Sequence, residues 1–91
     1  MKYLSTFNES LFHAVDYYRT IDKKLAIRFF DAVDEAKRQI SQFPKIGKLV
    51  GGYRVFILRD FPYSFCYRED FEGEIVAVLL FHHKQSGPGI E

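Results

Sequence analysis

Basic and histidine side chains in the second half of the chain are the residues best suited to chemistry. Cleavage of a phosphodiester without a metal needs a group that takes the 2′-hydroxyl proton, a group that protonates the leaving oxygen, and cations that stabilise the phosphorane charge. Five positions carry side chains of these kinds: Arg54, Arg59, His82, His83 and Lys84. The alternative, favoured for Arg59, is that a strand-end cation is an ordinary solvated charge or a contact to an acidic partner.

Arg54 is the strongest single candidate for a functional role. It lies in the middle of an alternating segment, where the pattern otherwise requires an apolar side chain. At most one of the two histidines reaches a functional face, because neighbours in a strand point to opposite sides, and His82 is taken as the candidate. The same geometry keeps His82 and His83 from ligating one ion easily, so no metal site and no cofactor is expected.

The single cysteine, Cys66, offers little nucleophilic chemistry. It lies between Phe65 and Tyr67, and no basic neighbour in the strand lowers its thiol pKa, so a small buried side chain is its expected role. One cysteine cannot form an internal disulfide, which is typical of a reducing compartment, and no apolar run reaches the ~18 residues of a membrane span. We therefore expect a cytoplasmic protein without a membrane partner.

Composition predicts one packed domain over residues 1–91. The chain contains 10 Phe and 6 Tyr and is 47% hydrophobic, which is enough apolar surface to offset the entropy of ordering so short a chain. Its net charge of +1 excludes nucleic-acid binding driven by overall charge. The charges are unevenly placed, however. Between residues 44 and 68 the only acid is Asp60, against the bases Lys45, Lys48, Arg54, Arg59 and Arg68.

The first half of the chain predicts a short strand and two helices. Strand-forming side chains occupy residues 2–7, and Asn8 is a good N-cap for a helix that extends to about Arg19. Asp22 is the N-cap candidate for a second helix, whose apolar positions keep helical spacing until Pro44 ends it. Helices joined by so short a link form an αα-hairpin.

The second half predicts three strands in an antiparallel meander. After a glycine-rich turn the periodicity becomes alternating, over residues 53–59, 63–68 and 74–82. The expected fold is α+β, in the order β-α-α-β-β-β, with the N-terminal strand and the helical hairpin packed on a mainly antiparallel four-stranded sheet. Residues 85–91 are expected to form a flexible tail.

Both faces of this sheet are expected to be apolar, whereas one helical hairpin covers only one face. Another chain is therefore expected to cover part of the second face. Arg54, Phe56 and Leu58 share one side of their strand by the period of two, and this side is predicted to face the partner beside a cationic rim. The full set of candidate binding residues is Lys45, Lys48, Arg54, Phe56, Leu58, Arg59 and Lys84.

Several short motifs, taken in order, carry a resemblance to a known family. They are Tyr17-Tyr18, Leu25-Ala26 with Phe29, Pro44 with Gly47, Arg54, Phe61-Pro62-Tyr63 with Tyr67, and a Val-Leu-rich strand ending at His82-His83. In this order and at these spacings, from Leu4 to about Lys84, the chain resembles the RelE/ParE toxin superfamily.

The resemblance implies a toxin made beside an unstable antitoxin, whose C-terminal segment wraps the toxin and neutralises it, so that oligomers form through the antitoxin. RelE-like members cut messenger RNA in the ribosomal A site, whereas ParE-like members poison DNA gyrase. The Tyr17-Tyr18 pair and the modest net charge favour the ParE-like branch. The family's last strand often runs into a His, one or two Arg, a Pro and an aromatic, but here no aromatic follows Pro88, which counts against RNA cleavage.

The sequence therefore predicts a ParE-like toxin with an antitoxin and DNA gyrase as partners. One alternative is a RelE-like endoribonuclease acting on ribosome-bound messenger RNA, in which Arg54, His82 and Lys84 would be the catalytic residues. The other is a toxin remnant or a non-toxic interaction module.

Overall fold

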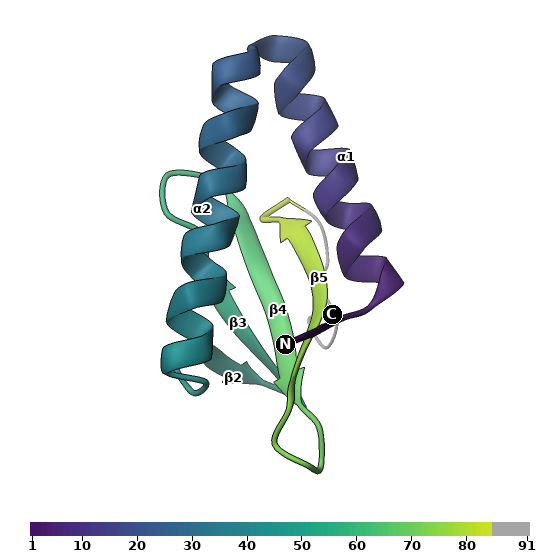
Figure 1. Ribbon diagram of the computed structural model, residues 1–91, viewed down its shortest axis with the longest axis vertical. Coiled ribbons are helices and arrows are strands. Elements are labelled where there is room, and N and C mark those ends of the chain that lie inside the picture. The colour runs from purple at the N-terminus through teal and green to yellow at the C-terminus, as the bar shows by residue number, and fades with distance from the viewer. Residues whose placement is uncertain (85–91) are drawn as a thin grey trace.

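The computed structural model describes residues 1–84, and the predicted flexible tail lies outside the described residues. Figure 1 shows two long antiparallel helices against one face of a sheet. The elements in chain order are β1 (Lys2–Tyr3), α1 (Ser5–Ile21), α2 (Lys23–Gln42), β2 (Lys48–Val50), β3 (Tyr53–Ile57), β4 (Tyr63–Glu69) and β5 (Ile75–His82). The predicted α+β class and element order are confirmed.

The sheet has the strand order β1-β5-β4-β3-β2. β1 lies parallel to β5, and the other neighbours are antiparallel. β2 adds a strand that the sequence did not predict, because its three residues lie in the glycine-rich segment that we interpreted as a turn. Gly51, with φ +60, makes the tight return from Val50 to Tyr53, which face each other across the two strands.

The first helix begins earlier than predicted. It starts at Ser5 rather than after Asn8, and the backbone N–H groups of Phe7 and Asn8 donate to the carbonyl of Leu4. The predicted strand over residues 2–7 is therefore only two residues long. Helical geometry at this point turns Phe7 into the core, where its ring lies 4.9 Å from the ring of Phe65, and the burial of so large an aromatic outweighs the local strand propensity.

The helical hairpin follows the sequence prediction closely. The Asp22 side chain caps α2 by accepting a hydrogen bond from the backbone nitrogen of Lys24 at 3.0 Å. Phe43 leaves helical geometry before Pro44, as expected. Tyr18 is buried, as its spacing predicted, with its ring 5.0 Å from that of Phe29.

The side of the sheet that faces the helices differs from the prediction. Phe56 packs against the core under the helices, and Leu58, only 3% exposed, belongs to that core. The expectation that these two residues line the open face is therefore wrong. Alternation shows that Arg54, Phe56 and Leu58 point to the same side of the sheet. It does not show which side the helices cover, because the strand has apolar residues on both sides.

The opposite face of the sheet carries a second, smaller cluster. Its buried members are Cys66, Val76, Val78 and Phe81, with Tyr53, Val55 and Leu79 partly buried against them. Ile57, which shares the parity of Val55, is 64% exposed. Within residues 1–84, the apolar side chains of this face are therefore buried or half-buried, except at the margin where Ile57 is exposed.

A β-bulge in β5 changes which set of alternate residues faces the helices. Cys66 pairs with Leu79 and Tyr67 pairs with Ala77, so Val78 is an extra residue. Before the bulge Ala77 faces the helices, and after it Leu80 does. The regular alternation expected over residues 74–82 therefore shifts by one residue halfway along the strand.

Side chains of α1 continue the role of β1 along the edge of β5. β1 ends at Tyr3, and the nitrogen of Leu4 donates to the carbonyl of Ala77 at 3.0 Å. Beyond it, Thr6 Oγ1 donates to the carbonyl of Val78 at 2.7 Å, and Ser10 Oγ accepts from the nitrogen of Leu80 at 2.9 Å. Two helix hydroxyls thus satisfy backbone groups that a longer β1 would have paired.

Candidate functional site

Arg54 anchors the loop that joins α2 to β2. Its Nη1 donates to the carbonyl of Gly47 at 3.0 Å and lies 3.4 Å from the carbonyl of Lys45. The strand pairing places Arg54 opposite Tyr67, on the helix side of the sheet. The mid-strand cation that the sequence singled out is therefore directed at backbone carbonyls of its own chain.

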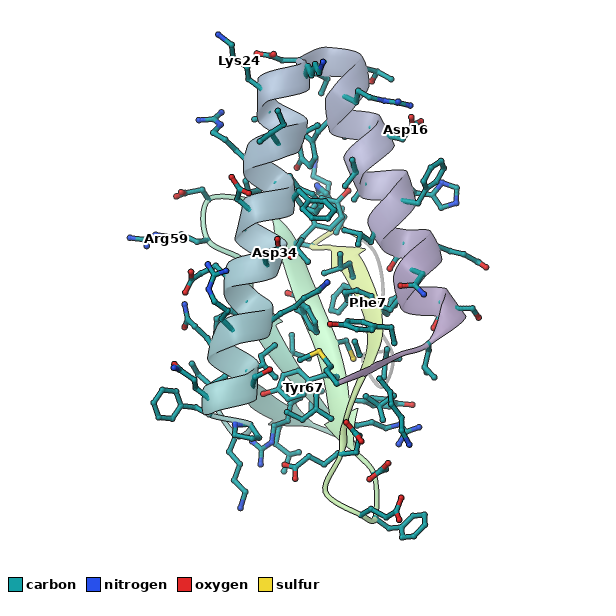
Figure 2. All side chains as sticks on the ribbon, in the orientation of Figure 1. Phe7, Asp16, Lys24, Asp34, Arg59 and Tyr67 are labelled. Atoms are coloured by element: carbon teal, nitrogen blue, oxygen red, sulfur yellow. The ribbon has the colours of Figure 1, made fainter. Side chains whose placement is uncertain are left out.

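Tyr67 holds the same loop from beneath. Its hydroxyl accepts a hydrogen bond from the nitrogen of Gly47 at 2.9 Å and donates one to the carbonyl of Pro44 at 2.7 Å. The side chain is fully buried, and this burial raises the pKa of the phenol, so it stays protonated and able to donate. Figure 2 shows Tyr67 beside the end of α2 that leads into this loop.

The loop and the neighbouring edge strand present exposed cations beside exposed apolar side chains. Lys45 and Ile46 lie on the loop, and Lys48 and Leu49 lie on β2, the last strand of the sheet. All four are exposed, and Leu49 is 60% exposed. Lys48 and Leu49 point to opposite sides of the sheet and so flank the free edge of β2; we call these four residues the β2-edge surface. A shallow hollow of about 500 Å³ adjoins it, lined by Gln42, Phe43, Pro44, Lys45, Ile46 and Glu69.

His82 and Lys84 lie at the end of β5. The His82 ring lies 5.1 Å from the ring of Tyr63, and its Nδ1 accepts from the nitrogen of Lys84 at 3.1 Å. The neighbouring His83 makes a 3.1 Å hydrogen bond with Ser64. Both histidines thus have partners within the chain at the strand end.

The structure does not bring together the three residues of the ribonuclease hypothesis. Arg54 lies opposite Tyr67 on β4, whereas His82 lies opposite Tyr63. These positions are four residues apart along β4, which corresponds to about 13 Å at ~3.3 Å per residue. Lys84 follows His82, so it lies at the far end from Arg54 as well.

Arg59 occupies a third location. It is exposed in the turn between β3 and β4 and projects outward beside α2, well away from Tyr67 (Figure 2). It helps line a hollow of about 410 Å³ with Leu25, Arg28, Asp31, Ala32, Glu35, Asp60 and Phe61. Hydrogen bonds from Arg38 and Gln39 lower the pKa of Glu35, and Arg59 adds a smaller contribution. Arg59 therefore belongs to a mixed-charge surface on α2.

Two features escaped the sequence analysis. One is the Tyr67 contact with Gly47, which joins residues 20 positions apart in the chain and leaves no local signal. The other is Phe71, whose side chain is 98% exposed in the turn between β4 and β5. Here the sequence did contain a signal, because an aromatic residue lies among Glu69, Asp70 and Glu72 in a segment that we had assigned to a turn.

Cys66 fits its predicted role as a buried side chain. It is fully buried in the smaller cluster on the sheet face away from the helices, which we call the outer-face cluster. Burial raises its thiol pKa to about 11. Within residues 1–84, no group of three or more His, Cys, Asp or Glu side chains has an arrangement that could hold a metal ion. In the same part of the chain, no helix is both long and apolar enough to cross a membrane.

Comparison with known proteins gives one family and one fold. The family model described as "ParE toxin of type II toxin-antitoxin system, parDE" matches residues 1–87. A solved structure titled "Chromosomal ParDE TA system from P. aeruginosa" contains a chain that superposes with a TM-score of 0.76 at 20% identity, covering 89% of this chain and 91% of that chain. At this identity the likeness shows a shared fold. Among curated proteins no match was found.

Proposed function

This chain belongs to the family of ParE toxins of type II toxin–antitoxin systems, and from that membership we propose that it inhibits DNA gyrase and is neutralised by a cognate antitoxin. The match over residues 1–87, nearly the whole chain, is the observation that carries the proposal. Because gyrase acts on chromosomal DNA, the toxin would work in the cytoplasm.

The positions of the basic residues support gyrase inhibition over RNA cleavage. Stabilising a phosphorane requires cations and proton-transfer groups around one phosphate. Arg54 donates instead to the carbonyl of Gly47, and His82 and Lys84 lie at the other end of the strands. No single phosphate would be reached by all three residues in this arrangement.

The β2-edge surface is the antitoxin contact that we propose. β2 ends the sheet, so its outer side offers backbone groups to an added strand. The lysines Lys45 and Lys48 would attract acidic side chains, while Ile46 and Leu49 would be buried against apolar ones. An acidic amphipathic antitoxin segment has this chemistry. Leu58, buried in the core, and Phe56, packed under the helices, are withdrawn as contacts, whereas Arg59 and Lys84 stay candidates as exposed cations.

The test of gyrase inhibition uses purified full-length protein in a supercoiling assay, with messenger RNA on ribosomes as the parallel substrate. We expect loss of supercoiling or trapped cleaved DNA, reversal by the antitoxin, and intact messenger. Folded protein that leaves gyrase fully active would overturn the proposal. Codon-specific cleavage of messenger would replace it with the ribonuclease function.

The antitoxin contact is tested with charge reversal at the two lysines. The double variant Lys45→Glu/Lys48→Glu should inhibit gyrase as before but bind the antitoxin about tenfold or more weakly, because it repels acidic side chains. The matched control is Lys23→Glu/Lys24→Glu, at the opposite end of the molecule (Figure 2). Equal antitoxin affinity for the two double variants would show that the β2-edge surface is not part of the antitoxin interface.

A further inference from the structure

Phe71 is the most exposed large apolar side chain in the described part of the chain. It is 98% exposed, whereas the next, Phe12 on α1, is 66% exposed. Single apolar residues on a protein surface are ordinary. A phenylalanine ring with almost no contacts, however, adds no hydrophobic stabilisation to the folded state. Its presence at the tip of the β4–β5 turn therefore has no explanation within the fold of residues 1–84.

The turn that carries Phe71 has a defined backbone. The Asp70 carboxylate accepts hydrogen bonds from the nitrogens of Glu72 and Glu74, both at 2.9 Å. The nitrogen of Asp70 donates to the carbonyl of Glu74, and that of Gly73 donates to the carbonyl of Asp70, both at 2.9 Å. We call residues 70–74 the Phe71 hairpin. An aromatic side chain presented on such a backbone loses little chain entropy on binding, which is a property of strong interface anchors.

The charge around Phe71 indicates what would receive it. Glu69 and Glu72 flank it in the sequence and are exposed, whereas Glu74 pairs with the N-terminal ammonium of Met1 at 3.3 Å and Asp70 lies 3.6 Å from Nζ of Lys2. Cations at the rim of a partner pocket would favour entry of the ring, because they attract Glu69 and Glu72 where an acidic rim would repel them. The β2-edge surface has the opposite charge, with Lys45 and Lys48. The chain thus presents one surface suited to an acidic partner and another suited to a basic one.

We propose that the Phe71 hairpin is the element that engages the toxin's target, with Phe71 inserted in an apolar pocket of gyrase whose rim carries lysine and arginine side chains. This inference rests on the proposed function, since gyrase is the target named there. An enzyme that holds DNA must expose cationic surfaces to neutralise phosphates, and such a surface is complementary to the acids that flank Phe71.

The proposal also gives antitoxin binding a direct means of neutralisation. β2 and the Phe71 hairpin lie at the same end of the molecule (Figure 1). Glu69, which precedes the hairpin, lines one hollow with Lys45 and Ile46 of the β2-edge surface. A chain seated on the β2-edge surface would therefore lie beside the hairpin and hinder its approach to gyrase.

The test compares Phe71→Ala with Phe12→Ala in the full-length protein. Both changes remove an exposed phenylalanine, so each should leave the melting temperature unchanged. We expect Phe71→Ala to raise the concentration for half-inhibition of gyrase about tenfold or more, while antitoxin affinity stays within about twofold of wild type. Phe12→Ala should change neither quantity. Glu72→Lys, which places a cation beside the ring, should weaken inhibition in the same direction.

Four results would overturn the inference. Equal inhibition by wild type and Phe71→Ala would show that the ring is not an anchor for gyrase. A loss of antitoxin affinity in Phe71→Ala would assign the hairpin to the antitoxin, and a loss of self-association, measured by sedimentation, would assign it to a second copy of the chain. If wild-type protein itself leaves gyrase active, both the proposed function and this inference fail. If wild type and Phe71→Ala inhibit gyrase equally, only this inference fails.

Discussion

The hydroxyl of Tyr67 lies 2.9 Å from the nitrogen of Gly47 and accepts its hydrogen bond, beneath the loop that follows α2. The same oxygen donates to the carbonyl of Pro44. One buried phenol on a central strand therefore fixes the exit of the long helix and, through it, the start of β2. In the described part of the chain, no buried side-chain nitrogen or oxygen lacks a hydrogen-bond partner, so removal of this hydroxyl would break a fully satisfied arrangement.

Replacing Tyr67 by Phe should lower the free energy of unfolding by about 1–3 kcal/mol, because two backbone groups lose their partner while the ring keeps its packing. Urea denaturation followed by circular dichroism measures this change. Tyr17→Phe is the control, since Tyr17 is 57% exposed and its substitution should cost less than about 0.5 kcal/mol. An equal effect of the two changes would contradict the structural role of the Tyr67 hydroxyl.

Gly47→Ala should destabilise the protein through steric overlap. A Cβ at this position would lie 2.9 Å from the Tyr67 hydroxyl oxygen and 3.1 Å from the Cβ of Arg54. We expect a loss of about 1–3 kcal/mol in the free energy of unfolding, as for overpacked core positions. Gly52→Ala is the matched control, since nothing lies within 4 Å of its added Cβ. A Gly47→Ala protein as stable as Gly52→Ala would show that the loop moves freely away from Tyr67.

Ser10→Ala should expose the backbone nitrogen of Leu80 to exchange with solvent. Ser10 Oγ is its acceptor, and no β1 residue replaces it because β1 ends at Tyr3. Hydrogen exchange followed by NMR should show faster exchange at Leu80, with the amides of β4 unaffected. Ser41→Ala, an exposed change near the end of α2, provides the control. Unchanged protection of Leu80 would mean that its amide is shielded by something other than the serine.

The Phe71 hairpin should lose its order in acid. A backbone hydrogen bond from Glu74, supported by one from Glu72 and by the charge of Lys2, lowers the pKa of Asp70 in the folded protein. Since its folded pKa lies below the ordinary value of about 3.9, the stabilisation is present above about pH 4 and is lost as the pH falls through the lowered pKa. The backbone amide chemical shifts of Glu72 and Glu74, measured by NMR as a function of pH, should follow this titration.

Asp70→Asn supplies the control for that titration. The asparagine side chain cannot ionise. The backbone amide chemical shifts of Glu72 and Glu74 should therefore no longer change as the pH is lowered through the pKa of Asp70. An ordinary, unshifted titration of Asp70 in the wild-type protein would contradict the hydrogen bonds that hold the turn.

Cys66 should resist thiol reagents in the native protein. Its thiol is fully buried and has a pKa of about 11, so almost no thiolate is present near pH 8 and none is accessible. Ellman's reagent should react at once in denaturant and only slowly without it. Rapid reaction of the native protein would show that the outer-face cluster opens readily.

The helical hairpin could be predicted from the sequence because its signals are local. Spacing separated the buried Tyr18 from the exposed Tyr17, Asp22 caps the second helix, and Pro44 ends it. Each of these depends on residues within one or two turns of helix. The family was reached in the same way, from short motifs in a fixed order.

The sheet was predicted less well because its faces depend on distant residues. The bulge at Val78 changes the parity of β5, and no local pattern marks it. The helices cover the side that includes Phe56 and Leu58, a choice that alternation cannot make when both parities are apolar. Arg54 was consequently predicted to be a cation on the open face. In the structure it anchors a loop, through contacts with carbonyl groups seven and nine positions away in the chain.

The pairing of β1 with β5 has a consequence for synthesis on the ribosome. Tyr3 of β1 pairs with Ala77 of β5, and β5 lies between β1 and β4 in the sheet. The nascent chain can form its helical hairpin early, from local contacts, but the edge of the sheet has no partner until the last strand emerges from the exit tunnel. Translation that stalls before β5 therefore yields helices without a completed sheet, and the fold would be complete only once residue 82 has left the exit tunnel.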